Sequence, residues 1–272
     1  MQTKLTVVVD NIAYGDMLGE WGLAIHIEHN GKIIMADVGA SELFADNMKK
    51  LGFDIADVDY ATLSHAHYDH AGGMPRFFKE NSKAKFYVRE TTQANCYARK
   101  FLFRKYIGIP KNVLKDYPDR IEIVSGDYSL CEGAYLIPHK TQGLEAIGKR
   151  ELMFQKTTRG WKPDNFSHEQ SLVLDTDKGL VIINCCSHGG AVNIINEVAQ
   201  TFPDKHVYGI IGGFHLFNKS DDEVRAVAEK IKETGIDFVC TGHCTKERAY
   251  NVLKETLGDN LCQLRVGLEM VF

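Results

Sequence analysis

The stretch Ser64-His65-Ala66-His67-Tyr68-Asp69-His70-Ala71-Gly72-Gly73 places four side chains able to bind a metal ion within six residues. An apolar run precedes it and a proline follows its glycine pair, which predicts a strand ending in a loop and then a helix. His65 and His67, two apart, can point to the same side of an extended backbone. Asp69 and His70 fall on the turn into the helix and can face the same space. A solvated polar loop is the alternative, but this density of ligand types favours a metal site.

The second half of the sequence presents a histidine at three more predicted strand ends. His188 lies in Cys185-Cys186-Ser187-His188-Gly189-Gly190, His215 in Gly212-Gly213-Phe214-His215, and His243 in Gly242-His243-Cys244-Thr245. Ligands at successive strand ends of one rim are what a metal site at the edge of a sheet requires. No single histidine is strong on its own, but together with the first cluster they predict one shared site.

The pattern His-x-His-x-Asp-His after a strand resembles the metal-binding signature of the metallo-β-lactamase-fold superfamily. This resemblance implies an αββα sandwich: two facing mixed β-sheets with helices on the outside, and a metal site at one edge of the sheets. The motifs Glu169-Gln-Ser-Leu-Val-Leu, Cys186-Ser-His-Gly-Gly, Ile211-Gly-Gly-Phe-His-Leu and Gly242-His-Cys-Thr are similar to a narrower, stand-alone branch. That branch includes the 7,8-dihydropterin-6-methyl-4-(β-D-ribofuranosyl)aminobenzene-5′-phosphate synthases, and the similarity runs from about Gly22 onward.

The resemblance also implies a ligand set. Carried over to this sequence, His65 and His67 serve one metal ion, while Asp69, His70 and His243 serve a second. Asp69 is in addition the implied catalytic group, which holds the metal and accepts the proton of the nucleophile.

The remaining ligand positions stay open. Cys186 or His188 stands where the superfamily usually has a bridging aspartate, and His168 stands near the expected third histidine of the first metal. For His215 we favour a supporting or pocket-lining role. Asp37, two residues before a glycine, resembles a carboxylate that orients a metal ligand through a hydrogen bond, with a turn-forming aspartate as the alternative.

Composition is that of an ordinary globular protein, with 272 residues, 44% apolar, 25% charged and a net charge of −4. We expect one domain over residues 1–272, a small-molecule substrate and no nucleic-acid partner. The absence of an 18-residue apolar run predicts no membrane partner. Seven irregularly spaced cysteines and the lack of a signal-peptide pattern favour reduced thiols and a cytoplasmic protein. The sequence carries no signal for an oligomeric state.

Hydrophobic periodicity predicts alternating strands and helices. Strands are expected at 4–9, 22–28, 32–38, 54–63, 85–88, 121–124, 134–138, 171–175, 179–184, 207–211, 237–241 and 262–271, and helices at 41–51, 73–79, 90–100, 191–201, 221–234 and 246–257. Two segments, 101–120 and 141–168, lack this rhythm and are expected to be substrate-shaping insertions.

Several side chains in and near these segments have two possible interpretations. Basic residues there could meet an anionic substrate group, with ordinary surface charge as the alternative (Arg104, Lys105, Lys111 and Lys162). Trp161 or Phe166 could stack on a ring. His139 is expected to be a surface histidine at a strand end.

The ligand types suit two divalent ions, with Zn²⁺ favoured and Mn²⁺ or Fe as alternatives. Zinc can lower the pKa of a bound water to about 7. The sequence therefore predicts a metal-dependent hydrolase acting on a small, phosphorylated or pterin-like substrate. A transferase like the dihydropterin synthases is one alternative, and a metal-containing sensor or ligand-binding protein is another. Walker-type and Gly-x-Ser-x-Gly motifs are missing from the sequence.

Overall fold

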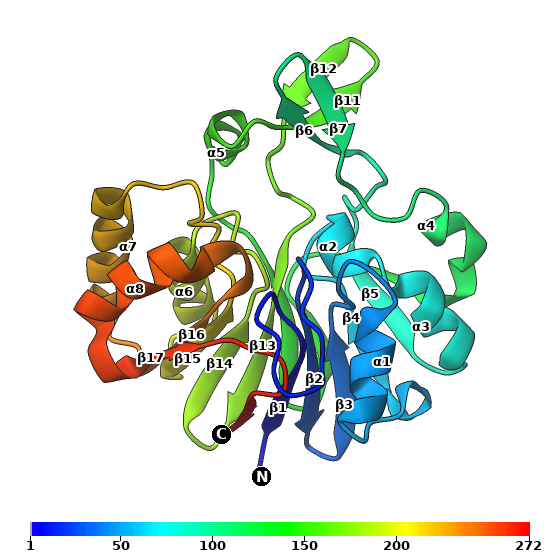
Figure 1. The fold of residues 1–272 in the computed structure, drawn as a ribbon, viewed down its shortest axis with the longest axis horizontal. Coiled ribbons are helices and arrows are strands. Elements are labelled where there is room, and N and C mark those ends of the chain that lie inside the picture. Colours follow the sequence, from blue (N-terminus) through cyan, green and yellow to red (C-terminus); the bar gives the residue numbers. More distant parts are fainter. Residues whose placement is uncertain (1) are drawn as a thin grey trace.

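Two seven-stranded β-sheets face each other and carry helices on both outer faces (Figure 1). The structure is a computed structural model and describes residues 2–272. The helices are α1 (Leu43–Lys50), α2 (Tyr68–Ala71), α3 (Met74–Glu80), α4 (Val113–Asp116), α5 (Glu145–Arg150), α6 (Ala191–Thr201), α7 (Asp221–Glu233) and α8 (Lys246–Leu257). None of the helices within residues 2–272 has the length and apolarity needed to cross a bilayer.

The first sheet has the strand order β18-β1-β2-β3-β4-β5-β8. Its strands are β1 (Lys4–Val9), β2 (Ala24–His29), β3 (Lys32–Ala36), β4 (Tyr60–Thr62), β5 (Lys85–Arg89), β8 (Ile121–Val124) and β18 (Glu269–Val271). The Asn30-Gly31 turn joins β2 and β3, and both residues adopt the positive φ that such a tight hairpin needs. β3, β4, β5 and β8 run parallel.

The second sheet has the order β17-β16-β15-β14-β13-β10-β9. Its strands are β9 (Tyr128–Cys131), β10 (Ala134–Pro138), β13 (Gln170–Thr176), β14 (Gly179–Ile183), β15 (Val207–Gly212), β16 (Phe238–Thr241) and β17 (Leu261–Gln263). β14, β15, β16 and β17 are parallel, so their carboxyl ends meet at one edge. The single strand predicted at 262–271 is wrong: β17 and β18 lie in different sheets.

A third, four-stranded sheet stands away from the sandwich at the top of Figure 1. Its order is β12-β11-β6-β7, with β6 (Cys96–Lys100), β7 (Phe103–Tyr106), β11 (Met153–Thr157) and β12 (Gly160–Pro163). The helix predicted at 90–100 is therefore wrong, because β6 pairs with the distant β11, a contact that local periodicity does not reveal. Parts of the segments 101–120 and 141–168, expected to be irregular, build the rest of this sheet, which we call the lobe.

Three apolar clusters fill the spaces between the layers. One fills the space between the two large sheets, with Leu5, Ile25, Leu172 and Ile183 among its buried members. A second packs α1 and α3 on the first sheet, and a third packs α6, α7 and α8 on the second sheet. Alternating side chains on each strand supply both the inner and the outer cluster. The layers are thus helix, sheet, sheet and helix, as predicted.

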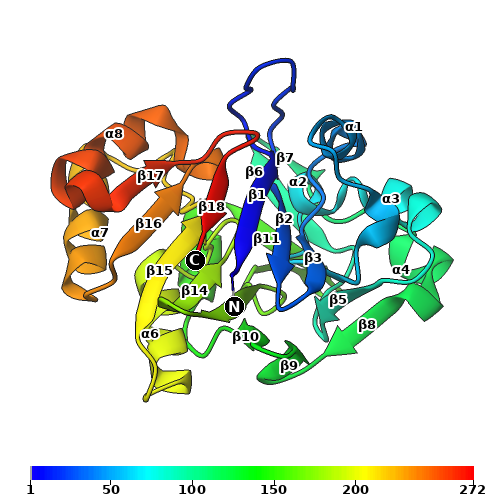
Figure 2. The same cartoon turned by 90° about the horizontal axis from the view of Figure 1, so that it is seen from below.

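The termini and the site lie at opposite ends of the sandwich. β1 and β18 pair, which sets the two chain ends side by side at the lower end of the sheets, as Figure 2 also shows from below. The carboxyl ends of β3, β4, β14, β15 and β16 all point to the other end, beneath the lobe (Figure 1). The predicted ligand loops follow these five strands, so the topology gathers them at one rim.

Candidate metal centre

The loop after β4 carries the first group of candidate ligands. His67 has extended backbone (φ −105°, ψ 151°) and directly precedes α2, on which Asp69 and His70 lie. Gly72 allows the loop to pack against its neighbour, because a Cβ there would lie 2.0 Å from the carbonyl oxygen of Ala40. The glycines of this motif thus serve close packing, and the histidines are left to face the rim.

Asp37 orients two of these histidines. Its fully buried carboxylate accepts the backbone N–H of Ser64 at 2.7 Å and the Ser64 hydroxyl at 2.5 Å. His70 Nδ1 lies 2.7 Å from Asp37 Oδ2, and His65 Nδ1 lies 2.9 Å from Ser64 Oγ. Each histidine therefore donates its Nδ1 hydrogen, which leaves the Nε2 lone pair of both rings directed toward the rim.

His65, His67 and His188 form one compact group. Their ring centroids are 4.5 to 4.8 Å apart, and one ligand atom from each lies within 4.8 Å of the others. Among residues 2–272, no hydrogen-bond partner exists for His65 Nε2, His67 Nε2 or either ring nitrogen of His188. Buried polar atoms are rarely left unpaired, at a cost of about 1–3 kcal/mol each, so this group is suited to a cation.

Asp69, His70, Cys186 and His243 form the adjoining group. Asp69 Oδ2 lies 3.6 Å from His243 Nε2 and 3.8 Å from His70 Nε2, and Cys186 Sγ lies 3.2 Å from His70 Nε2. Two ligand atoms on one tetrahedral zinc ion are roughly 3.4 Å apart, given bonds of about 2.1 Å. The spacing of these four side chains therefore fits a second cation beside the first.

The histidine charges are also suited to metal binding. Burial lowers the pKa of His67 and of His243 to about 3, and it lowers the pKa of His65 and His188 well below the usual range. Neighbouring imidazoles add to the effect at each site. All four rings are thus neutral near pH 7, the form in which histidine binds a metal.

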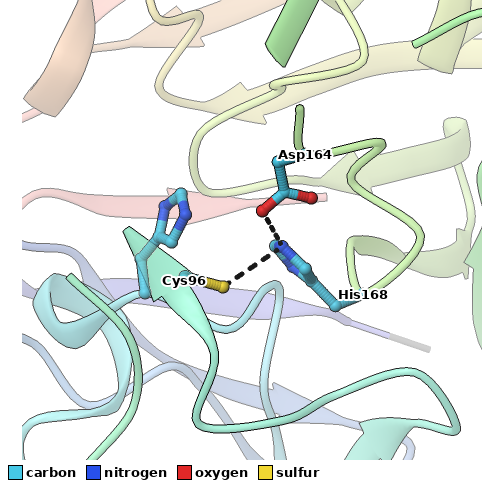
Figure 3. A group of neighbouring side chains, drawn as sticks. Cys96, Asp164 and His168 are labelled. Carbon is cyan, nitrogen blue, oxygen red and sulfur yellow. Dashed lines mark hydrogen bonds and ion pairs between the residues drawn. The ribbon is translucent and has the colours of Figure 1, made fainter. Parts of the chain in front are cut away.

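His168 is placed differently from the other candidates. Its Nδ1 accepts the backbone N–H of Ala66 at 3.1 Å, so its hydrogen must be on Nε2, which lies 3.2 Å from Asp164 Oδ2. Cys96 Sγ is 3.6 Å from the same nitrogen. Figure 3 shows Cys96 and Asp164 on either side of the His168 ring. With both nitrogens engaged, His168 holds the backbone between His65 and His67 and offers no lone pair to a metal.

Two further side chains complete the rim. Cys244 Sγ lies 3.5 Å from Cys186 Sγ and accepts the backbone N–H of His215 at 3.2 Å. His215 packs on His188 with ring centroids 4.5 Å apart, and neither of its ring nitrogens has a hydrogen-bond partner within residues 2–272. Sequence reasoning missed Cys244, although its position next to His243 at a strand end was the available signal. Cys185, by contrast, is a core residue.

A buried charge cluster holds the loop that bears His188. Glu169 accepts the backbone N–H groups of His188 (2.9 Å) and Gly189 (3.0 Å). His139 hydrogen-bonds Glu169 through Nε2 and lies 3.0 Å from Glu197 through Nδ1. Burial opposes charge on His139, but the two carboxylates outweigh it and raise its pKa to about 10. The expectation that His139 is a surface residue is therefore wrong: it is a buried cation that holds this loop.

Left-handed backbone occurs at four residues of the same loops. Asp37, Ser187, His215 and His243 all adopt left-handed backbone, with φ between 46° and 58°. Such conformations cost about 1 kcal/mol or more for residues other than glycine, and they cluster at functional sites. Here each lies at a strand end of the rim, where the left-handed turn aims or supports a candidate ligand.

A cavity of about 180 Å³ lies beside the two groups of candidate metal ligands. Its walls are mostly apolar or aromatic, and it reaches Asp69, Cys186 and His188 at its floor. The lobe contributes Ala98 and Met153, and the remaining non-ligand walls include Trp21, Tyr68, Ile107 and Phe217.

Several side chains considered for substrate contacts pack against other residues of the chain. Phe166 is fully buried and stacks on His188 at 4.7 Å, so the expectation that it stacks on a substrate ring is wrong. Arg104 lies over the Trp161 ring at 4.6 Å, and Lys111 lies 5.4 Å over the Tyr106 ring.

Comparison with known proteins agrees with this geometry. The sequence profile of the metallo-beta-lactamase superfamily matches residues 22–243. The chain belongs to this superfamily. It is 29% identical over 260 residues to the 7,8-dihydropterin-6-methyl-4-(beta-D-ribofuranosyl)-aminobenzene-5′-phosphate synthase of Methanocaldococcus jannaschii, covering 89% of this chain and 86% of that protein. The family resemblance predicted from the sequence is thus confirmed.

Solved structures confirm the predicted sandwich. The crystal structure of Tm1679, described as a metal-dependent hydrolase of the beta-lactamase superfamily, superposes with a TM-score of 0.84 at 27% identity, covering 98% of each chain. The metallo-beta-lactamase fold protein YhfI of Bacillus subtilis gives a TM-score of 0.60 at 10% identity over 100% of this chain and 99% of that one. At that identity the second likeness concerns the fold alone.

Proposed function

We propose that this protein is a metal-dependent hydrolase with two divalent ions at the rim. In this assignment His65, His67 and His188 hold one ion, and Asp69, His70 and His243 hold the other, with Cys186 at the boundary between the two groups. The superfamily generally uses divalent metals, and two histidines with oriented Nε2 lone pairs, a carboxylate and a thiol suit zinc.

One observation carries the proposal. Ring nitrogens of His65, His67, His188 and His243 that have no hydrogen-bond partner within residues 2–272 are buried and converge from three separate loops. A structural core would pair or exclude such groups, and a polar surface would hydrate them. Nitrogens that are buried, neutral and aimed at one another are best explained by ions bound among them.

The residues of the chain have distinct roles in the proposed reaction. When bound, divalent ions supply a water of lowered pKa and polarise the substrate oxygen. Asp69, which has an oxygen within 4 Å of both His70 and His243, accepts the proton from the attacking water and transfers it to the leaving group. Asp37 fixes the tautomer and direction of His70 throughout. The apolar walls of the cavity exclude bulk water around these groups.

The substrate is expected to be a small molecule with a flat or apolar part and an anionic group. Trp21 and Phe217 meet edge to face at 6.0 Å on the cavity wall. The exposed Lys246 lies 5.2 Å over Trp21 and 5.9 Å over Phe217, and it has no ion-pair partner within residues 2–272. An aromatic wall beside a free ammonium group supports a phosphorylated or pterin-like substrate.

A transferase of the dihydropterin synthase type is the second candidate. The identity of 29% to the Methanocaldococcus jannaschii synthase over most of both chains favours it. The same rim could serve group transfer if an organic acceptor takes the place of water in the cavity.

Metal analysis and turnover of a phosphodiester test substrate by the same preparations test the proposal. We expect His67→Ala to lose at least about one metal equivalent and to lower kcat by about a thousandfold or more. His206→Ala removes an exposed histidine (side chain 53% exposed) far from the rim and is the matched control. This variant should keep both its metal content and its kcat. Unchanged turnover by a folded His67→Ala protein shown to have lost its metal would contradict the enzyme assignment.

A further inference from the structure

The β6–β7 hairpin of the lobe ends in three consecutive exposed apolar side chains. Phe101, Leu102 and Phe103 are 86%, 85% and 78% exposed. The lobe stands clear of the two large sheets (Figure 1). Single exposed apolar residues are common on proteins, but three adjacent ones at the tip of a projecting hairpin indicate a contact surface.

The tip is flanked by positive charge. Arg99 and Lys100 precede it, Arg104 and Lys105 follow it, and all four side chains are exposed. Residues 91–115 contain no aspartate or glutamate, and neither do residues 153–163 of the lobe. The whole chain has a net charge of −4, so the lobe is a basic region on an otherwise acidic protein. Its partner is therefore expected to be anionic around an apolar centre.

The pairing of the hairpin and its ring contacts show which apolar side chains of the lobe are exposed and which are covered. Lys100 pairs with Phe103 and Arg99 pairs with Arg104. On the Arg104 face, the guanidinium lies 4.6 Å from the Trp161 ring and 5.0 Å from the Phe154 ring, so these aromatic faces already have a partner. The most exposed apolar surface of the lobe is the tip itself, which is suited to entering an apolar layer rather than to stacking on bases.

We propose that the β6–β7 tip docks on a membrane surface that contains anionic lipids. In this arrangement Phe101, Leu102 and Phe103 enter the boundary between headgroups and acyl chains, while the four flanking cations extend to the lipid phosphates. The contact is peripheral and involves no spanning segment. The proposal revises the sequence-based expectation of no membrane partner, which considered only a spanning helix. A lobe-to-lobe contact between two copies would bring two basic tips together and is disfavoured by charge.

Sedimentation of the full chain with lipid vesicles tests this proposal. We expect binding to vesicles of phosphatidylcholine with phosphatidylserine, weak binding to phosphatidylcholine alone, and loss of binding at high salt. The variant Phe101→Ser/Leu102→Ser/Phe103→Ser should bind the anionic vesicles at least about tenfold more weakly. Ile123→Ser removes an apolar side chain that is 66% exposed on β8, away from the lobe, and should bind like the unaltered chain. The unaltered chain, the triple serine variant and Ile123→Ser should have the same metal content and the same turnover.

A second readout identifies the inserting segment. Leu102→Trp should show a blue shift of its fluorescence on addition of anionic vesicles and none with phosphatidylcholine alone. Failure of the unaltered chain to bind anionic vesicles would overturn the proposal. So would a dimer, detected by light scattering, that the triple serine variant abolishes, because the partner would then be a second copy. Tip-dependent binding to single-stranded RNA in place of vesicles would overturn it as well.

Discussion

At the scale of single residues, the candidate metal ligands depend on neighbouring side chains that fix their orientation and tautomer. Asp37 binds no candidate ion, yet its carboxylate sets the tautomer of His70 directly and that of His65 through Ser64. A single buried carboxylate therefore influences both halves of the proposed metal centre. Such supporting partners typically change metal affinity by about 10- to 100-fold when they are removed.

Asp37→Asn is expected to lower zinc affinity by about 10- to 100-fold while the protein stays folded. Asparagine tolerates the left-handed backbone of this position (φ 58°) but carries no charge to stabilise a donating His70 ring. Competition with a zinc chelator measures the change. Asp59→Asn is the matched control, because Asp59 accepts a backbone N–H in the same sheet but lies near Lys83, away from the rim. Equal zinc affinity in the two variants would contradict the role given to Asp37.

The two histidines left open by the sequence can be distinguished in the same way. His188→Ala should lose about one metal equivalent, because neither ring nitrogen of His188 has a hydrogen-bond partner within residues 2–272 and the ring faces His65 and His67. His168→Ala should keep its metal and lose activity only in part, because His168 supports the backbone of Ala66. Elemental analysis of both variants measures this. The reverse pattern would assign the third ligand to His168.

At the scale of elements, the sequence predicted most strands and helices, but it did not predict the contacts between distant segments that hold the rim loops in place. The sequence located β1, α6 and α8 with their observed bounds. The two helices have a clear apolar face toward one sheet, and β1 is a short apolar run that is buried on both faces. The sequence missed β6, which pairs with β7 on one side and, on the other, with β11, more than 50 residues later. It also missed the buried role of His139, which is set by Glu169 from one strand end and Glu197 from α6.

His139 couples three elements, and its charge should make that coupling depend on pH. Its pKa is raised from 6.5 to about 10 in the folded protein, so its stabilising effect is full below pH 6.5 and is lost as the pH rises through about 10. His139→Gln should therefore destabilise the protein by about 3 kcal/mol at pH 6 and by much less at pH 10.5. Urea unfolding at both values measures the difference.

An exposed ion pair provides the control for His139. His206 and Asp237 form a pair with side chains 53% and 59% exposed. Such a surface pair contributes about 0–1 kcal/mol, so His206→Gln should change the free energy of unfolding little at either pH. An equal cost of His139→Gln at pH 6 and pH 10.5 would show that shape, and not charge, holds the loop of His188.

At the scale of the whole molecule, the fold brings candidate ligands from both sheets to one rim, where several of their ring nitrogens have no hydrogen-bond partner within residues 2–272. His65, His67 and His70 come from the first sheet, while His188 and His243 come from the second. Ions bound among them would cross-link the two halves of the sandwich. The sequence could predict which residues converge, because family motifs and strand ends are local signals. It could not predict which nitrogens stay free, because this depends on hydrogen bonds between distant loops.

Removal of metal should consequently weaken the entire sandwich and not only the rim. Protein stripped with a chelator should melt at a lower temperature, and added Zn²⁺ should raise the melting temperature progressively, because the ions bind the folded chain in preference to the unfolded one. At free zinc of 100 times Kd the gain is about 2.7 kcal/mol for one site, or roughly 5–10 °C for a domain of this size. Mg²⁺, which prefers oxygen ligands, should give a much smaller shift at equal concentration. His188→Ala should show a reduced zinc-dependent shift, and a melting temperature independent of zinc in the unaltered protein would mean that the free nitrogens do not join the sheets through metal.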